Sequence, residues 1–217
     1  MVRFAKTDDQ DNVRSLLGKC FNTGWEYLDL FFGKCPKVFV INELNGRIAS
    51  AASLMRISYI SSCGSHPGLY LYALCTDEKF RGLGCAHELI SFIKNFASDL
   101  GWEFLLVRPA GPELTMFYVE QGFTRKIYRN HSILPSFENP SCITGYDCNT
   151  LFLKRHAFFK KDYFQWSNIM LNYIIEEARV NPCDTTGDSL QPFVLLCPLK
   201  EGFTTDTRVS VFSYPME

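Results

Sequence analysis

One short stretch, residues 77–86, combines glycine, a basic side chain and small residues between two regularly patterned segments; it is Asp-Glu-Lys-Phe-Arg-Gly-Leu-Gly-Cys-Ala. Glycine lets a backbone approach a phosphate closely because it has no Cβ, and the first amides of a following helix lack intrahelical partners. Arg81 adds a planar cation that pairs with phosphate oxygens. The stretch therefore predicts a backbone cradle for a phosphate or diphosphate group.

The segments on either side position this cradle. Residues 69–75 form a nearly continuous apolar run of strand length, which is typical of a central strand covered on both faces. Over residues 84–100 the apolar positions recur every 3.6 residues, which predicts an amphipathic helix. The cradle then lies where a buried strand ends and a helix begins, and the helix dipole adds positive charge at the phosphate.

Two common phosphate-binding patterns fit this stretch poorly. G-x-x-x-x-G-K-[ST] is absent, and G-x-G-x-x-G is met only by Gly82 and Gly84, because His87 stands where the third glycine belongs. The stretch resembles instead the acyl-CoA signature of the GNAT superfamily of N-acetyltransferases, [RQ]-x-x-G-x-[GA]. Arg81, Gly84 and Ala86 meet that signature.

A second segment and the order of elements strengthen this resemblance. Residues 117–123, Phe-Tyr-Val-Glu-Gln-Gly-Phe, are similar to the family's F-Y-x-x-x-G-F ending of a short helix. The expected order of elements over residues 2–130 is also similar to that of the family. It begins with a strand and a helix, a short helix, and a hairpin around Asn45-Gly46 whose return strand is at 47–59. A loop at 61–68, the central strand, the long helix, a strand at 104–107 and a short helix from 112 follow. The resemblance implies a mixed-sheet α/β fold, the GNAT-like acyl-CoA N-acyltransferase fold, with splayed central strands.

The resemblance implies an acyltransferase that moves an acetyl or other acyl group from acetyl-CoA, its co-substrate, directly to a primary amine in a ternary complex. Backbone groups of Tyr72 and Leu74 would pair with the pantetheine arm and polarise the thioester carbonyl. Tyr118 matches the family's tyrosine near the sulfur, where a phenol gives a proton to the departing thiolate. The residues that would hold the pyrophosphate are Arg81, Gly82, Leu83, Gly84, Cys85 and Ala86.

The group that takes a proton from the amine is less clearly marked. Some family members carry a glutamate at the head of the central strand, where this sequence has Gly68. His66 and Tyr70 are the local substitutes, and His66 is the candidate general base because imidazole titrates near neutral pH. A loop histidine without a catalytic part is the alternative.

Composition restricts the partners. The chain has 217 residues, with 22 basic and 23 acidic side chains and a net charge of −1, so it lacks the basic excess typical of nucleic-acid binding. No apolar run approaches a membrane span, and the charged start does not resemble a signal peptide. Nine cysteines without C-x-x-C spacing predict reduced thiols and no metal site. We expect a cytoplasmic protein that binds neither membrane nor nucleic acid.

The expected division places the acetyltransferase domain at residues 1–135 and an extension at 136–217. Residues 131–150 have connector composition, 162–178 predict a helix, and 193–197 and 207–214 predict strands. The extension would cover the sheet and shape the acceptor pocket, or form the face of a homodimer. Its order also resembles the first half of another GNAT unit, an incomplete copy without its own glycine signature.

Two alternatives to an active enzyme remain open. The first is a catalytically silent acyl-CoA-binding module, because the binding signature is clearer than the base. The second is an interaction protein that keeps only the fold. The acceptor is a small-molecule or peptide amine, and the sequence does not choose among polyamines, amino sugars, amino acids and protein N-termini.

Overall fold

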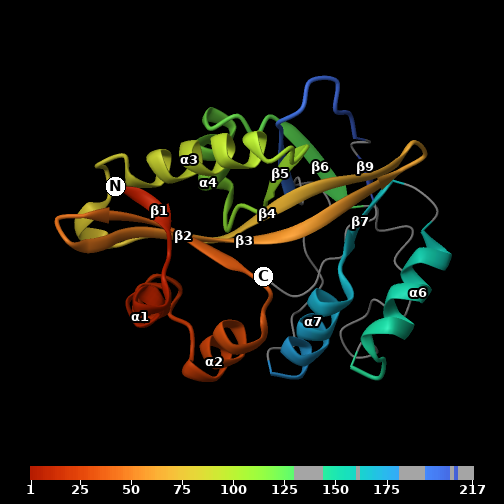
Figure 1. Ribbon diagram of the computed structural model, residues 1–217, viewed down its shortest axis with the longest axis horizontal. Coiled ribbons are helices and arrows are strands. Elements are labelled where there is room, and N and C mark those ends of the chain that lie inside the picture. Colours follow the sequence, from red (N-terminus) through yellow and green to blue (C-terminus); the bar gives the residue numbers. More distant parts are fainter. Residues whose placement is uncertain (130–143, 160–161, 181–193, 206–207, 210–217) are drawn as a thin grey trace.

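A computed structural model describes residues 1–129, 144–159, 162–180, 194–205 and 208–209 of the chain (Figure 1). A nine-stranded mixed sheet runs through these residues in the order β1-β2-β3-β4-β5-β8-β6-β9, and β7 pairs with β3 outside that path. Only β4 with β5 and β6 with β9 pair in parallel. The mixed-sheet α/β class expected from the sequence is confirmed. None of the helices in the described ranges has the length and apolar character that a membrane span needs.

The strands and helices have the following bounds. The strands are β1 (Val2–Phe4), β2 (Val38–Leu44), β3 (Arg47–Ser61), β4 (Gly64–Thr76), β5 (Phe104–Val107), β6 (Arg125–Arg129), β7 (Tyr163–Trp166), β8 (Val194–Pro198) and β9 (Arg208–Val209). The helices are α1 (Gln10–Phe21), α2 (Trp25–Lys34), α3 (Cys85–Asp99), α4 (Pro112–Glu120), α6 (Cys148–Phe158) and α7 (Asn168–Val180), with the 3₁₀ turns η1 (Thr7–Asp9) and η2 (Glu78–Phe80).

Helices cover both faces of the sheet. Figure 1 shows α3 and α4 on one face and α1, α2 and α7 on the other. The central strand β4 contributes to both layers: Leu69 and Leu71 pack in the core under α3, whereas Tyr70 packs in the core under α1, α2 and α7. A strand buried on both faces must be apolar at every position, which explains the continuous apolar run in the sequence.

The expected loop at residues 61–68 is wrong. β3 and β4 form one long antiparallel hairpin that pairs from Ser50 with Thr76 to Ser61 with Gly64, so that only residues 62–63 turn. Glycine and proline at this place indicated a loop. Pairing of β3 with β4 on one side and with β7 on the other keeps the backbone extended instead.

The C-terminal part joins the same sheet. The helix expected at 162–178 is wrong at its start, because Tyr163–Trp166 forms β7 against residues 57–60 of β3, and α7 begins only at Asn168. The strand expected at 193–197 is found as β8, between β5 and β6. Most of the expected connector and most of the expected tail strand lie outside the described residues. The domain boundary at residue 135 stays a prediction.

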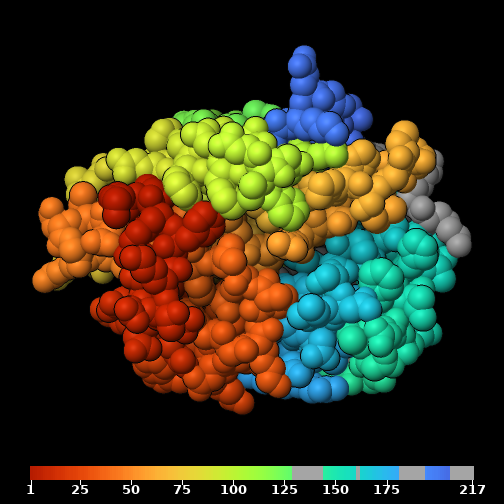
Figure 2. Space-filling model, viewed as in Figure 1, coloured from red at the N-terminus to blue at the C-terminus, as the bar shows by residue number. Residues whose placement is uncertain are grey.

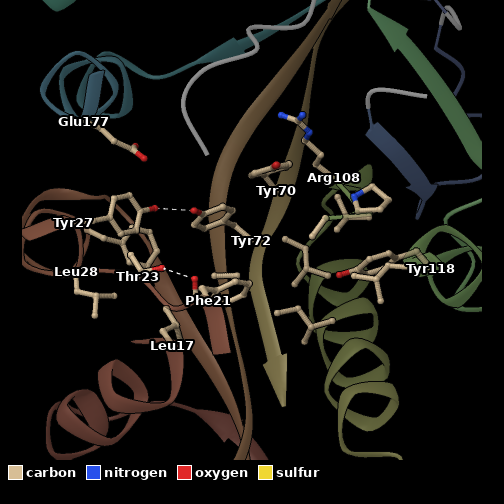
Figure 3. Close-up of a pocket in the computed structure, with 18 residues that line it drawn as sticks. Leu17, Phe21, Thr23, Tyr27, Leu28, Tyr70, Tyr72, Arg108, Tyr118 and Glu177 are labelled. Carbon is tan, nitrogen blue, oxygen red and sulfur yellow. Dashed lines mark hydrogen bonds between the residues drawn. The ribbon is translucent and has the colours of Figure 1, made fainter. Parts of the chain in front are cut away.

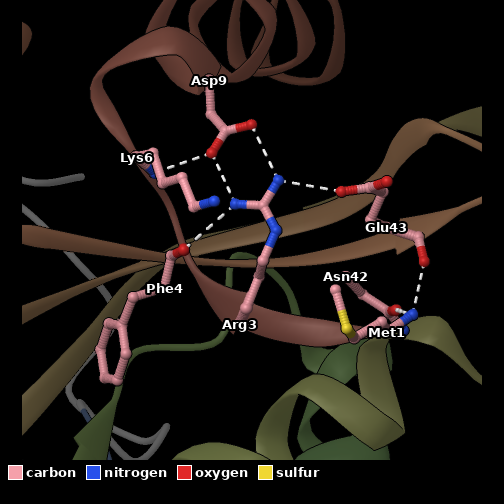
Figure 4. Close-up of polar contacts among 7 residues, drawn as sticks. All are labelled: Met1, Arg3, Phe4, Lys6, Asp9, Asn42 and Glu43. Carbon is pink, nitrogen blue, oxygen red and sulfur yellow. Dashed lines mark hydrogen bonds and ion pairs between the residues drawn. The ribbon is translucent and has the colours of Figure 1, made fainter.

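The position of α1 depends on an arginine cluster at the edge of the sheet (Figure 4). The two terminal nitrogens of Arg3 in β1 lie 2.6 and 3.0 Å from the carboxylate oxygens of Asp9, and one of them lies 2.9 Å from Glu43 of β2. The hydrogen bonds from Arg3 and from the Lys6 amide lower the pKa of Asp9 to about 2. The cluster thereby ties β1 and β2 to the residue that precedes α1.

In Figure 2, the N-terminal helices and the residues 148–159 and 162–180 lie next to one another on the same side of the sheet. Lys34 of α2 and Glu176 of α7 join the two groups by an ion pair of 2.7 Å. Segments far apart in the sequence therefore meet on the face that carries Tyr70 and Tyr72 of β4.

We predict that Gly68→Ala destabilises the protein by about 1–3 kcal/mol. A Cβ at Gly68 would lie 2.3 Å from the Phe104 ring, which packs flat on the backbone there. The same substitution at Gly33 in α2 meets no atom within 4 Å and is expected to be neutral or slightly stabilising. Urea unfolding of both variants measures the difference, and equal stability of Gly68→Ala and wild type would contradict this packing.

Candidate functional site

The two central strands part at their carboxyl ends. β4 and β5 pair from Gly68 with Phe104 to Leu71 with Val107, after which β5 ends and β4 continues to Thr76. β4 also bulges here, because two residues, Ala73 and Leu74, stand opposite one residue of β3. The splayed strands expected from the sequence are therefore present, and the bulge lies at the opening.

Ala73 holds an unusual backbone conformation at this bulge. Its φ is +52°, in the left-handed region that non-glycine residues adopt at a cost of about 1–3 kcal/mol. The hydroxyl of Ser53 in β3 donates a hydrogen bond of 2.9 Å to the Tyr72 carbonyl and fixes the strand just before it. Strain of this kind persists where the surrounding structure enforces it, and it turns backbone groups away from the sheet.

A cavity of about 390 Å³ opens between the parted strands (Figure 3). Because β4 and β5 separate, residues from both faces of the sheet line it: α1, α2 and α7 contribute from one face, and α4 contributes from the other. Tyr72 and Leu74 of β4 lie on its wall, as does Arg108, which follows β5. The structure thus brings Tyr72, Leu74 and Tyr118, three of the expected site residues, around one space.

The glycine stretch lies just beyond the same end of β4. Gly82 and Gly84 both have φ of +78°, which only glycine adopts without strain, and a Cβ at either position would point into open space. Gly84 is the residue before α3, so the first amides of that helix, from Cys85, have no intrahelical partners. Arg81 is exposed. This geometry fits an anion held by backbone amides in the space that a Cβ would fill.

Buried polar side chains fix the first turn of α3 against the sheet. Asn42 of β2 and Ser50 of β3 are 1% and 0% exposed, and they donate hydrogen bonds of 3.3 and 3.2 Å to the Cys85 carbonyl. Asn42 also donates a bond of 2.8 Å to the Glu88 carboxylate one turn later. The two strands therefore set the position of the helix end that forms the cradle.

Tyr118 projects from α4 toward the cavity (Figure 3). It is 6% exposed, and burial raises its pKa to about 12. Phe117 and Phe123 pack on its ring with centroids 5.2 and 5.7 Å away. The phenol therefore stays protonated at neutral pH, in an orientation fixed by aromatic packing, and can donate a proton.

On the α2 side, two tyrosines and a carboxyl group meet. The hydroxyls of Tyr27 and Tyr72 are 2.7 Å apart and hydrogen bonded. Glu177 of α7 lines the same cavity and is 0% exposed, and neither of its oxygens has a hydrogen-bond partner among the described residues. Burial raises the pKa of Glu177 from 4.5 to about 8. The nearby hydroxyls of Tyr173 and Tyr27 lower this pKa in part, although neither makes a hydrogen bond to the carboxyl group within the described chain.

Sequence reasoning missed Glu177, although a signal for it exists. In the helix expected near the C-terminus, Tyr173, Ile174 and Ala178 lie on the apolar face, and position 177 falls between them on that face. A carboxylate within an apolar stripe is costly unless it has a partner or a task. The acidic residue at position 177, on the apolar face of the expected helix, is therefore the sequence signal for this site.

His66 lies elsewhere. It stands six residues before Tyr72 on β4, or about 20 Å along the strand, and it does not line the cavity. Its Nδ1 is 2.8 Å from Glu103, which also binds Lys200 at 3.1 Å, and its Nε2 is 3.0 Å from the Ser61 hydroxyl. These contacts join the start of β4 to the segments before β5 and after β8. The catalytic role expected for His66 stays a prediction.

The described ranges contain no group of three His, Cys, Asp or Glu side chains that could hold a metal ion. The cysteines they contain are free thiols, of which Cys75 and Cys85 are buried near the site. What the arrangement offers is therefore an anion cradle, an opening between strands, a protonated phenol and a buried carboxyl.

The model of the Acetyltransferase (GNAT) family matches residues 10–123, which is more than half of the chain. The match contains the glycine cradle, the bulge of β4 and Tyr118. No curated protein matches the chain.

Solved structures share the fold at low sequence identity. A GNAT family N-acetyltransferase of Escherichia coli, solved in complex with CoA, has a TM-score of 0.53 and 13% identity over 94% of this chain and 86% of that one. A probable N-acyltransferase of Enterococcus faecalis has a TM-score of 0.51 and 10% identity over 59% of this chain. A GCN5-related N-acetyltransferase of Anabaena variabilis has a TM-score of 0.50 and 15% identity over 60%.

The match covers 32% and 33% of the Enterococcus and Anabaena proteins, so this chain spans about a third of their length. At these identities the likeness concerns the fold. The incomplete second GNAT-like unit expected in residues 136–217 is not confirmed.

We predict that Asn42→Ala lowers the free energy of unfolding by about 1–3 kcal/mol, because it removes the buried amide that binds Cys85 and Glu88. Asn12→Ala, on the exposed face of α1, is the matched control and should stay within about 0.5 kcal/mol of wild type. Denaturant unfolding measures both. An unchanged stability of Asn42→Ala would show that the amide does not anchor α3.

Proposed function

The chain belongs to the acetyltransferase (GNAT) family, and on this premise we propose that it transfers an acetyl group from acetyl-CoA directly to a primary amine. Acyl transfer is the chemistry of that family. The donor, the direct route and the amine acceptor are the parts that we add. They rest on the site described above.

The cradle fits the pyrophosphate of CoA. The open space over Gly82 and Gly84 admits phosphate oxygens as far as the backbone, and the unpartnered amides from Cys85 onward would bind them. Arg81 is exposed beside the loop, where a guanidinium pairs with a second phosphate oxygen. The remaining loop residues, Leu83 and Ala86, contribute backbone groups to the same cradle.

The pantetheine arm would follow β4 into the opening. Beyond Leu71 the edge of β4 no longer pairs with β5, so backbone groups of Tyr72 and Leu74 are available to the arm and to the thioester carbonyl. Acetyl-CoA supplies an activated carbonyl carbon. A fixed amide at the bulge would stabilise negative charge on its oxygen without reorganisation.

Tyr118 would act as the proton donor. Its phenol is protonated at neutral pH because burial raises its pKa to about 12, and it faces the same cavity from α4. Donation to the departing sulfur avoids release of a free thiolate. Direct transfer is favoured over a covalent acyl-enzyme, because no imidazole among the described residues makes a hydrogen bond to Cys75 or Cys85.

One observation carries this proposal: a single strand, β4, has the bulged opening beside Tyr118 and ends at the glycine cradle. A ligand with an anionic end and a reactive end would be held along this strand. A catalytically silent acyl-CoA-binding module is the alternative, favoured by the position of His66 outside the cavity lining.

We predict that Gly82→Val and Gly84→Val each weaken acetyl-CoA binding at least about tenfold, because the side chain fills the phosphate space. Gly202→Val is the matched control, since Gly202 has the same φ of +78° and equally open surroundings but lies in a turn after β8. Calorimetric titration with acetyl-CoA measures the affinities. Equal losses in all three variants, or none, would contradict the cradle.

We predict that Tyr118→Phe lowers kcat by about 10²–10⁴-fold and leaves the acetyl-CoA affinity within about threefold of wild type. Thiol release across a panel of primary amines measures turnover. Tyr128→Phe removes the same hydroxyl from β6, outside the cavity lining, and should keep wild-type kcat. Binding of acetyl-CoA without turnover on any amine would favour the silent module.

A further inference from the structure

Glu177 is a buried acid for which no described residue supplies a hydrogen-bond donor. Both of its oxygens and the Tyr173 hydroxyl are buried without a hydrogen-bond partner in the described chain, and Tyr173 lies one helical turn before Glu177. A buried carboxyl without donors costs folding free energy. The carboxyl group of Glu177 lies at the wall of the cavity, and its two unpartnered oxygens therefore indicate that a ligand supplies the donors.

The wall around Glu177 is aromatic. Tyr27 and Phe31 of α2 and Tyr72 of β4 line the cavity beside it, with ring centroids 5.9 Å apart for Tyr27 and Phe31 and 5.5 Å apart for Phe31 and Tyr72. Figure 3 shows the carboxyl group of Glu177 directed toward the Tyr27 and Tyr72 hydroxyls. Aromatic faces attract cations through their quadrupole, and they do so more strongly where water is excluded.

An organic ammonium ion satisfies both features at once. A primary ammonium carries three N–H donors and one positive charge, which suit two carboxylate oxygens and a phenol. The surfaces next to these groups are apolar, with Leu17 and Phe21 from α1 and Leu28 from α2. An acceptor with a carboxylate or phosphate close to its amino group would place like charge against Glu177.

We propose that Glu177 and the aromatic box of Tyr27, Phe31 and Tyr72 bind the ammonium group of the acceptor, and that the acceptor is a primary amine on an apolar body. The identification of the bound amine as the acetyl acceptor rests on the proposed function. It gives the C-terminal segment 168–180 a direct part in substrate recognition. The family match ends at residue 123, well before this segment.

The site is pH dependent in a defined direction. The titratable groups around Glu177 are Tyr27 and Cys35 of the α2 segment, Tyr72 of β4 and Tyr173 of its own helix. Burial raises the pKa of each, so all four stay neutral at pH 8, while Glu177 ionises near that pH. Only the ionised carboxylate pairs with an ammonium, so affinity rises as the pH approaches 8 and levels off above it.

Ionisation of Glu177, which strengthens ammonium binding as the pH rises, lowers the stability of the unliganded folded state over the same pH range. A carboxyl with a raised folded-state pKa favours the folded state below its unfolded value of 4.5, and this contribution is lost as the pH rises toward about 8. Glu177→Gln removes the charge and keeps the shape. Its melting temperature should exceed that of wild type by on the order of 5 °C at pH 8, and by much less at pH 5.

Benzylamine without acetyl-CoA tests the site directly, and benzyl alcohol is its neutral counterpart. Calorimetric titration of the full chain at pH 8 should show that benzylamine binds more tightly than benzyl alcohol. The affinity for benzylamine should fall by up to about tenfold for each pH unit below 8. Glu177→Gln should lower benzylamine affinity about 10- to 100-fold and leave benzyl alcohol unchanged. Glu176→Gln, on the neighbouring residue that pairs with Lys34, should bind benzylamine as wild type does.

The outcomes separate this inference from the proposed function. Equal affinity for the two probes, or benzylamine affinity unaffected by Glu177→Gln, would overturn the ammonium site even if the protein acetylates amines. Ammonium binding that depends on Glu177 without acetyl transfer to any amine would support the site and refute the transferase. Because Glu177→Gln is expected to raise stability at pH 8, a variant that unfolds there would also contradict the inference.

Discussion

The parting of β4 from β5 is the constraint on which the rest of the site depends. Parallel pairing stops at Leu71 and Val107, and β4 continues beyond this point with a bulge at Ala73. An unpaired backbone inside a sheet is costly unless something else satisfies it. Here the gap becomes a cavity that both faces of the sheet can reach, so groups from helices on opposite sides surround one space.

The second requirement is a fixed helix end beside that opening. Peptide amides bind a phosphate well only if their position is set in advance, because reorganisation would consume the binding energy. Asn42 and Ser50 provide this by tying the Cys85 carbonyl to β2 and β3. Both side chains are buried, and their hydrogen bonds offset the cost of burying them. The Arg3 cluster gives a similar fixed start to α1, on the opposite face of the sheet.

The cavity has two chemically different walls. Toward α4 lies Tyr118, a phenol held protonated by burial, and toward α2 and α7 lie paired tyrosines and the Glu177 carboxyl. The cost of burying Glu177 falls on the folded state, whereas in the proposed ammonium site the benefit appears only when a cation is bound. Binding sites commonly contain groups that lower the stability of the folded protein and are needed for function. The proposed ammonium site would give the C-terminal segment a role beyond covering the sheet.

The sequence by itself determined the local parts: the glycine cradle, the helix that follows it, the apolar central strand and the tyrosine of α4. Each depends on neighbours in the chain, through backbone freedom at Gly82 and Gly84 or through periodicity. Only the tertiary structure decided what meets across the chain. It extended the β3–β4 hairpin through residues that indicated a loop, made a strand of Tyr163–Trp166, and brought Glu177 to Tyr27 and Tyr72. The last two outcomes depend on contacts between segments more than a hundred residues apart, which no local pattern encodes, and the hairpin also pairs with β7 across that distance.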